Sequence, residues 1–418
     1  MRVVTIAENS SYSLNDDDIP GFREFLSINS KLPVKLDDST LSFADYTIGS
    51  ITVQDLSIII QPRIKRLTPN HYFEMQLYNE GLLNTELSSM LGENSHYGIQ
   101  HNLIQLFLEE AYQLVLIGVE GSFERVVEES NVVKGRILPE QISPINLLRD
   151  RIPVEYEIHT LSTSSNKIIK LTLEKVLPLL EGTYQDKLYA LVGAYFEDID
   201  VVPSELPLLT IDCKSKIFFE NERYPTVLGL ALKILEELKL NMKSNRILGS
   251  SYLVNSNELF EAYTRKVLSK GLKLPITKWD NPRQFGQFTV GTVNVIKSYV
   301  PDIIVDFHYD TKSALAVLDA KNKDISNPQE IGNTADLYQI LFYCYNLDTT
   351  YGGLVYPSFG EMSAVRISIE SFRDNNLYAF SIDSVSSVEP SSMQSTSISS
   401  SDCERTLSRH SSKYLSAL

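Results

Sequence analysis

The residues whose types and spacing could do chemistry lie in the segment YVPDIIVDFHYDTKSALAVLDAKNKD, in the C-terminal third of the chain. Asp302 stands just before one apolar run, and Asp319 and Lys321 stand at the end of the next. Carboxylates can hold Mg²⁺, which polarises a phosphate and lowers the pKa of a bound water, and a lysine can orient or activate that nucleophile. These three residue types therefore fit the hydrolysis of a phosphodiester bond.

A β-hairpin would bring the three side chains together. The two apolar runs flank the turn-like HYDTKS, which is typical of paired antiparallel strands. Asp319 and Lys321 are two residues apart and so share one strand face, and pairing centred near Thr311 brings Asp302 close to both. Because so short a pattern is common, the alternative is a salt bridge between Asp302 and Lys321 at a strand end, with Asp319 capping a turn. The flanking segments decide between the two interpretations.

Two predicted helices on either side of the hairpin carry further polar residues. In NELFEAYTRKVLSKGL, Glu258 and Glu261 are three residues apart on one face, so one carboxylate can lean towards the cluster; a solvated helix surface is the alternative. In ADLYQILFYCYNL, Asp336, Gln339 and Tyr343 follow one stripe among apolar residues. Polar groups on such a stripe indicate a function or a partner.

Composition and periodicity divide the chain into four predicted regions. They are a β-rich N-terminal region over residues 1–100, a mainly helical middle region over residues 101–245, a domain that holds the hairpin over residues 246–385, and a disordered serine-rich tail over residues 386–418.

Local patterns support this division. Residues 41–64 alternate apolar and polar side chains and are broken by Gly49, which predicts short antiparallel strands. Residues 102–119 and 227–240 repeat apolar side chains at helical spacing. The segment Lys243–Ser251 is rich in small and polar residues, and we expect the boundary to the hairpin domain there.

The overall charge bears on possible partners. The 418 residues carry a formal net charge of -15, although affinity for duplex DNA rests largely on cations that neutralise phosphates. A nuclease of this charge needs a partner that holds the DNA. The sequence contains no P-loop pattern GxxxxGK[ST], so any nucleotide hydrolysis is expected to come from another chain.

Other features exclude several classes of protein. The three cysteines and six histidines show no spacing typical of a disulfide framework, a zinc ribbon or a histidine metal site. No apolar run is long enough to cross a bilayer, and the N-terminus lacks the features of a secretory signal. We therefore expect a cytoplasmic protein with no membrane partner.

The ordered set of motifs resembles the PD-(D/E)xK nuclease superfamily: a helix with Glu, a strand with PD, a strand with DAK and a helix with QxxxY. More narrowly, the run LFE, PDI, LDAK, DLYQ…Y and VYP is similar to the McrC family, the nuclease subunits of McrBC-type restriction systems. In the N-terminal half, YTIGSITVQDLSIIIQPRI is similar to that family's strand pair ending in an I-x-P-[KR] motif, and NVVKGRI to its basic G-[KR]-I element.

The resemblance implies a fold and a set of site residues. The fold is an α+β N-terminal region followed by an α/β PD-(D/E)xK restriction-endonuclease-like domain, in which helices flank a mixed sheet. The resemblance implies Asp302 and Asp319 as metal ligands and Lys321 as the catalytic lysine. It further implies Glu261 as the carboxylate from the preceding helix, and Gln339 and Tyr343 as supporting residues. Glu258 could replace Glu261 if the helix were rotated.

The resemblance also implies a function and partners. We expect a Mg²⁺-dependent endodeoxyribonuclease subunit, with Mn²⁺ as a substitute, that cleaves DNA when assembled with a McrB-like AAA+ ring that hydrolyses GTP. The resemblance allows a homodimer within that complex. Residues 1–245 are expected to suffice for binding the ring and stimulating its GTP hydrolysis, with basic residues as candidate contacts: Arg63, Lys65, Lys134 and Arg136.

Two other functions compete with this interpretation. One is a non-catalytic regulatory subunit that keeps a nuclease-like fold and stimulates the GTPase of its partner. The presence of Asp302, Asp319 and Lys321 argues against it. The other is a free-standing repair nuclease, which is disfavoured because the first 245 residues resemble no helicase or DNA-reading module.

Overall fold

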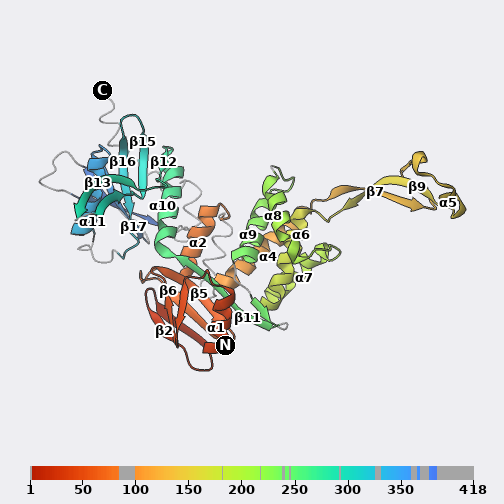
Figure 1. Ribbon diagram of the computed structural model, residues 1–418, viewed down its shortest axis with the longest axis horizontal. Coiled ribbons are helices and arrows are strands. Elements are labelled where there is room, and N and C mark those ends of the chain that lie inside the picture. Colours follow the sequence, from red (N-terminus) through yellow and green to blue (C-terminus); the bar gives the residue numbers. More distant parts are fainter. Residues whose placement is uncertain are drawn as a thin grey trace. The chain divides into compact units, whose positions relative to one another are not determined.

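The computed structural model describes most of the chain, and Figure 1 shows its helices and strands. The described residues are 2–83, 99–180, 182–216, 218–237, 241–243, 246–290, 293–324, 331–358, 365–367 and 376–383. They form two compact units: Met1–Ile99 together with Leu240–Leu418, and Gln100–Lys239. The predicted serine-rich tail, residues 386–418, lies outside the described residues.

The first unit begins with a five-stranded sheet in the order β1-β6-β5-β11-β10. Its strands are β1 (Arg2–Ala7), β5 (Thr47–Val53), β6 (Leu56–Gln61), β10 (Asn241–Lys243) and β11 (Arg246–Asn255). Strands β5 and β6 pair antiparallel, so the hairpin predicted from the alternating pattern is confirmed. Strand β1 pairs with β6 in parallel.

A helix and three short strands complete this N-terminal part. They are α1 (Ile19–Ile28), β2 (Ser11–Ser13), β3 (Val34–Asp37) and β4 (Thr40–Phe43), the strands lying in the order β2-β4-β3. Phe22 and Phe25 of α1 are fully buried against Ile51 and Ile58 of the larger sheet. Helix α1 is thus fixed to the sheet by its apolar face.

Strand β11 corrects the predicted domain boundary. Residues 249–255 pair antiparallel with β5, so most of the segment Lys243–Ser251 belongs to the N-terminal sheet instead of separating two domains. The small residues of this segment reflect close packing: a Cβ at Gly249 would lie 2.7 Å from the Thr52 carbonyl oxygen and 2.8 Å from the Phe25 ring. A fragment that ends near Ser244 would leave β5 without this neighbour, so it does not isolate a folded N-terminal half.

The second sheet of this unit contains the hairpin. Its order is β12-β15-β16-β17-β19-β18, and the strands are β12 (Ile276–Thr277), β15 (Ile303–His308), β16 (Ser313–Ala320), β17 (Tyr351–Ser358), β18 (Val365–Ile367) and β19 (Asn376–Asp383). Strands β15 and β16 pair antiparallel, whereas β16 pairs with β17 in parallel. The sheet is therefore mixed, as expected. A separate ribbon is formed by β13 (Arg283–Val290) and β14 (Val293–Tyr299).

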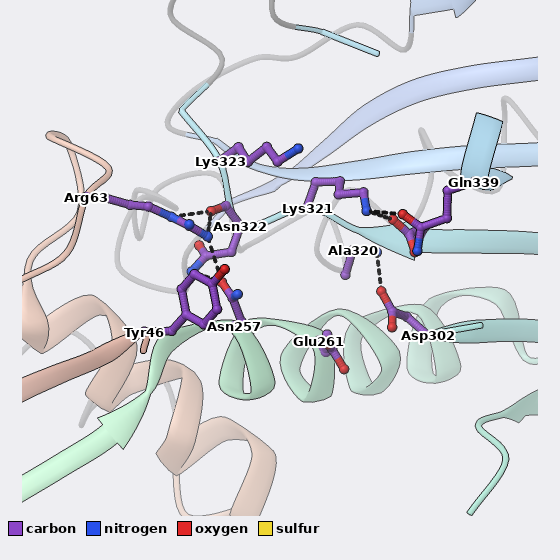
Figure 2. A pocket seen from close by; sticks show the side chains of 11 residues that line it. Tyr46, Arg63, Asn257, Glu261, Asp302, Ala320, Lys321, Asn322, Lys323 and Gln339 are labelled. Carbon is purple, nitrogen blue, oxygen red and sulfur yellow. Dashed lines mark hydrogen bonds and ion pairs between the residues drawn. The ribbon is translucent and has the colours of Figure 1, made fainter. Parts of the chain in front are cut away.

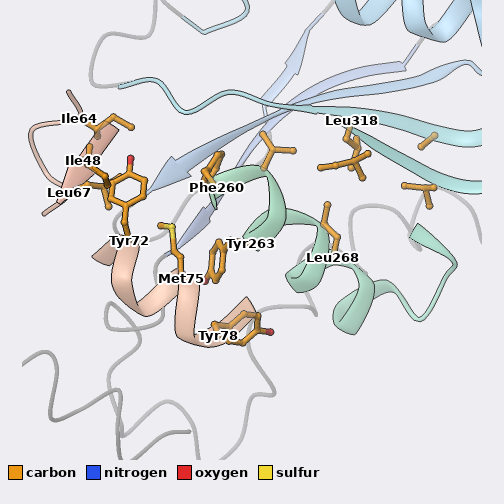
Figure 3. Close-up of a cluster of buried hydrophobic side chains, with 14 residues drawn as sticks. Ile48, Ile64, Leu67, Tyr72, Met75, Tyr78, Phe260, Tyr263, Leu268 and Leu318 are labelled. Atoms are coloured by element: carbon orange, nitrogen blue, oxygen red, sulfur yellow. The ribbon is translucent and has the colours of Figure 1, made fainter. Parts of the chain in front are cut away.

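Helices pack on both faces of this mixed sheet. Ile303 and Val305 point into a core shared with α2 (Pro69–Glu80) and α10 (Ser256–Leu272), which Figure 3 shows. Ile304 points the other way, into a core shared with α11 (Thr334–Asn346). The alternation along β15 follows from the two-residue period of a strand. Because α2 comes from the N-terminal region and α10 from the C-terminal one, the first and third predicted regions share one core.

The second unit combines helices with a long ribbon of strands. Its α-helices are α4 (Ile99–Ile117), α5 (Pro144–Leu148), α6 (Ser164–Val176), α7 (Thr183–Phe196), α8 (Leu206–Ser215) and α9 (Tyr224–Leu232), with a π-helical turn at Lys233–Glu237 and 3₁₀ turns at Pro139–Gln141, Leu177–Leu179 and Pro203–Glu205. The ribbon consists of β7 (Ser122–Ser130), β8 (Arg136–Ile137) and β9 (Ile152–Thr160). It extends away from the other helices of this unit and carries α5 at its far end (Figure 1). Among the described helices of the whole chain, none is both long and apolar enough to cross a membrane.

We expect Phe260→Ala to destabilise the first unit strongly. The Phe260 ring is fully buried between α2, α10 and the mixed sheet, so its removal leaves a cavity where three elements meet. The expected loss is about 3–5 kcal/mol of unfolding free energy, measured by denaturant titration. Tyr338→Ala is the control, because Tyr338 is 69% exposed on α11 and should change stability by less than about 0.5 kcal/mol. Equal effects of the two variants would contradict this packing.

Candidate active site

The register of the hairpin brings Asp302 next to the end of β16. Ile303 pairs with Leu318, and the Asp302 Oδ2 atom accepts a hydrogen bond of 3.0 Å from the Ala320 amide. Ala320 lies between Asp319 and Lys321, so the three residues meet at one end of the hairpin. The expectation that pairing near Thr311 would bring them together is confirmed in this geometry.

Lys321 holds Asp319 and Gln339 together. Its Nζ atom lies 2.5 Å from Asp319 Oδ2 and donates a 2.7 Å hydrogen bond to Gln339 Oε1 (Figure 2). Asp319 is only 1% exposed, so this ion pair lies largely out of water. An ammonium held at two points in a buried site has little freedom to rotate away.

Helix α11 places Gln339 and Tyr343 next to Lys321. Gln339 Nε2 donates to Tyr343 Oη at 2.8 Å, and Tyr343 Oη donates to the Val300 carbonyl oxygen at 3.3 Å. The two side chains are four residues apart and therefore lie on one helix face. Gln339 faces the site directly, whereas Tyr343 is buried behind it and fixes the orientation of the Gln339 amide.

The helix before the hairpin places Glu261 on the pocket side. Glu261 lines the same pocket as Asp302, and its carboxylate accepts a hydrogen bond from Lys278 Nζ at 2.8 Å. Glu258 is exposed in the first turn of α10, near the Asn255 cap, and does not line the pocket. The structure thus brings Glu261, and not Glu258, towards the carboxylate pair.

The pocket has a volume of about 290 Å³ and contains more than the predicted residues. Besides Asp302, Asp319, Lys321, Glu261 and Gln339, its lining includes Ala320 and five side chains without a predicted site role: Tyr46, Arg63, Asn257, Asn322 and Lys323. Tyr46, Arg63 and Asn257 come from segments remote in sequence from the hairpin, and of these the sequence indicated only Arg63, as a candidate contact to a partner.

Asp336 belongs to the polar stripe that the sequence indicated on helix α11, although no site role was predicted for it. Its carboxylate accepts hydrogen bonds of 2.7 and 2.9 Å from Lys323 Nζ and lies 3.5 Å from Lys321 Nζ. The Asn333 side chain caps α11 by accepting from the Asp336 amide, which fixes the start of the helix. Asp336 therefore ties α11 to the two lysines that follow β16.

A family model described as "McrBC 5-methylcytosine restriction system component" matches residues 43–357, which is well over half of the chain. The chain belongs to this McrBC family. The family recognised from the ordered motifs is confirmed. No curated protein matches the chain.

The fold of this McrBC family chain is similar to solved structures from Thermococcus gammatolerans. One is a chain of the "half-complex from tetradecameric assembly" of McrB AAA+ hexamers with bound McrC, with a TM-score of 0.67 and 17% identity, covering 98% of this chain and 100% of that chain. Another is a chain of the McrBC complex, with a TM-score of 0.49 and 17% identity over 65% of this chain and 88% of that chain. The first likeness shows a shared fold across nearly the whole length.

The electrostatics of the pocket favour a bound cation. Burial, together with the charges of Asp319 and Glu261, raises the pKa of Asp302 to about 7. Burial also raises the pKa of Asp319, although the Lys321 ammonium opposes that shift. The two carboxylates therefore resist losing their protons together, and a bound cation would relieve the repulsion between them.

The donor atoms indicate which cation fits. Asp302 and Asp319 offer carboxylate oxygens only, and no group of three or more His, Cys, Asp or Glu side chains in the described ranges is arranged to hold a metal. Mg²⁺ is usually bound by one or two carboxylates, with waters and substrate phosphates completing its shell. Zinc sites use at least three protein ligands, mostly nitrogen or sulfur. The residues present therefore fit Mg²⁺ or Mn²⁺.

We expect the metal-free chain to lose stability as the pH rises from about 4 to about 7. In this window the folded state keeps a proton on Asp302 that the unfolded state releases, because the pKa is about 7 folded and near 3.8 unfolded. Asp319 acts in the same direction. Asp302→Asn removes the titrating group while its amide oxygen can still accept from Ala320, so the decline should be smaller.

The measurement is the free energy of unfolding in urea with a chelator, at about pH 5 and about pH 8. Asp310→Asn, in the exposed turn of the same hairpin, should keep the wild-type decline. An identical decline in wild type and Asp302→Asn would show that Asp302 does not carry the raised pKa.

Proposed function

We propose that the chain is the endonuclease subunit of a McrBC-type restriction system, with a PD-(D/E)xK site that hydrolyses DNA phosphodiester bonds with Mg²⁺. The observation that carries this proposal is the pair of a half-buried Asp302 and a buried Asp319 beside Lys321 at one end of a hairpin. Such a pair is costly without a cation. Membership of the McrBC family supports the reaction class.

Asp302 and Asp319 would hold the ion through their carboxylate oxygens. When bound, Mg²⁺ supplies polarisation of the scissile phosphate and a water of lowered pKa. The chain itself fixes the two carboxylates: Asp302 by its bond from the Ala320 amide, and Asp319 by its place in the central strand β16. The ligands are thus held by a rigid sheet, which suits precise placement of a phosphate.

Lys321 acts as a positively charged donor. Burial of its ammonium lowers its pKa, but Asp319, Asp336 and Asp302 together outweigh that effect and raise it above the usual value. The side chain therefore stays protonated at neutral pH. It can orient the attacking water and stabilise charge that develops on the phosphate, and it does not act as the base. Gln339 and Tyr343 keep the ammonium in place for that task.

We further propose that the chain works with an AAA+ ring that hydrolyses GTP. The chain of similar fold comes from a solved assembly of McrB AAA+ hexamers with bound McrC. A net charge of -15 disfavours tight DNA binding by the chain alone, so a partner that holds the DNA resolves the difficulty. Of the basic candidates for this contact, Arg136 is exposed on the ribbon of the second unit, whereas Arg63 is bonded within the first unit.

Asp302→Asn and Asp319→Asn are each expected to reduce DNA cleavage by about 10³-fold or more while leaving partner assembly intact. Each change removes one ligand charge and almost no volume. Cleavage is measured on plasmid DNA with the partner, GTP and Mg²⁺ or Mn²⁺, and Asp310→Asn serves as the matched control in the same hairpin.

Normal cleavage by either variant would contradict the site. If instead the wild type never cleaves but still stimulates the partner GTPase, the non-catalytic regulatory function is correct.

Arg136→Glu in the full chain should weaken stimulation of the partner GTPase by about tenfold, because it reverses an exposed charge on the ribbon. Lys187→Glu, on the exposed face of α7, is the control with the same charge change. The GTPase rate is titrated against each variant. A Lys187→Glu variant that loses as much stimulation as Arg136→Glu would place the contact elsewhere.

A further inference from the structure

Asn322 follows directly after Lys321, and it is held from a distant part of the chain. The Arg63 guanidinium donates to the Asn322 carbonyl oxygen through Nη2 at 2.6 Å and through Nε at 3.0 Å (Figure 2). The two residues are 259 positions apart in sequence. Arg63 is the basic residue of the QPRI segment after β6, so the N-terminal sheet reaches the residue next to the proposed catalytic lysine.

Arg63 is itself fixed at several points. Its amide donates to Glu8 Oε2 at 2.9 Å, and its Nη2 donates to Asn257 Oδ1 at 2.8 Å. Its guanidinium lies 4.8 Å from the centroid of the Tyr46 ring. The other carboxylate oxygen of Glu8 accepts from Ser256 Oγ at 2.6 Å. Arg63 therefore joins the ends of β1 and β6 to the first turn of α10.

The Asn322 side chain is bonded at both ends. Its Oδ1 accepts from Tyr72 Oη at 2.8 Å, and its Nδ2 donates to Asn257 Oδ1 at 3.2 Å. Tyr72 is fully buried in α2, and Asn322 is nearly so. Because every bond partner sits on a separate, well-packed element, Asn322 has one position that satisfies all of them.

Lys321 is consequently fixed on both sides. Its amide donates to the Val355 carbonyl oxygen of β17 at 2.7 Å, and the next residue is held by Arg63. We propose that Arg63 is a positioning residue that clamps Asn322 and thereby sets Lys321 and Asp319 in their working geometry. This inference rests on the proposed nuclease function for its catalytic consequence. It makes the N-terminal sheet part of the active-site scaffold.

A direct contact between Arg63 and a DNA phosphate is the competing role, because the guanidinium lines the pocket and no described carboxylate lies within ion-pair distance of it. The two roles differ in their salt dependence. Loss of one phosphate contact lowers the slope of log affinity against log salt by about 0.9, whereas loss of a clamp leaves the slope unchanged.

The test compares Arg63→Gln with Arg66→Gln in the full chain. Arg66 is exposed, three residues further on, and makes no hydrogen bond or ion pair in the part of the chain that the structure describes, so it controls for the lost charge. Amide hydrogen exchange over residues 320–324 should become faster in Arg63→Gln and stay unchanged in Arg66→Gln. Single-turnover cleavage with the partner should fall by about 10²-fold only in Arg63→Gln.

Two further variants keep the test decisive. Arg63→Lys retains the charge and one donor, so it should recover part of the cleavage rate. If Arg63→Gln does not fold, Tyr72→Phe removes one hydrogen bond to Asn322 at nearly constant volume and should speed exchange over the same residues. DNA affinity of each folded variant, measured between about 50 and 200 mM salt, should keep the wild-type slope.

The outcomes separate this inference from the proposed function. Wild-type exchange and wild-type cleavage in Arg63→Gln would overturn the clamp, and so would a slope lowered by about 0.9. If the wild type fails to cleave DNA under any condition, the proposed nuclease function fails, while faster exchange in Arg63→Gln would still support the clamp. If Asp319→Asn abolishes cleavage and Arg63→Gln does not slow it, the clamp alone is wrong.

Discussion

Two carboxylates that share one pocket, Asp302 and Asp319, place the main constraint on this protein. Asp302 directly precedes β15 and Asp319 lies in β16, and burial is the largest cause that raises the pKa of each. The Lys321 ammonium does not fully offset the charge of either carboxylate, because it also interacts with Asp336. Protons or a bound cation therefore stabilise the arrangement, and the surrounding elements hold the pair in place.

That constraint explains why the site is built on a central strand. Strand β16 has neighbours on both sides, and cores on both faces of the sheet bury its apolar residues. Helix α10 brings Glu261 to one side of the pocket, and α11 brings Gln339 to the other. The N-terminal sheet adds the Arg63 bonds to Asn322. These elements together hold the two carboxylates close to one another despite their mutual repulsion.

Local sequence patterns predicted the elements that depend on residues close together in the sequence. The hairpin followed from two apolar runs around HYDTKS, and the placement of Gln339 and Tyr343 followed from helical spacing in ADLYQILFYCYNL. The ordered motifs also identified the family. The predicted roles of Asp302, Asp319, Lys321 and Glu261 remain proposals that the geometry supports.

Other features depend on contacts between remote segments, and no local pattern predicted those contacts. The bond between Arg63 and Asn322 spans 259 residues. Strand β11 was interpreted as a domain boundary because Gly249 and its serine neighbours resemble a linker, whereas their small size allows close packing against Phe25 and Thr52. Pairing of β11 with β5 and packing of α2 on α10 join the two ends of the chain into one unit, which periodicity alone does not encode.

The central claim is that Asp302 and Asp319 form a binding site for a divalent cation. Anomalous diffraction from crystals of the full chain soaked in Mn²⁺ tests it most directly, because the signal locates the ion without reference to activity. The account predicts a strong peak within coordination distance of both carboxylates, absent from crystals of Asp319→Asn treated in the same way. A wild-type pocket with no peak, at a soaking concentration that places Mn²⁺ elsewhere on the protein, would contradict it.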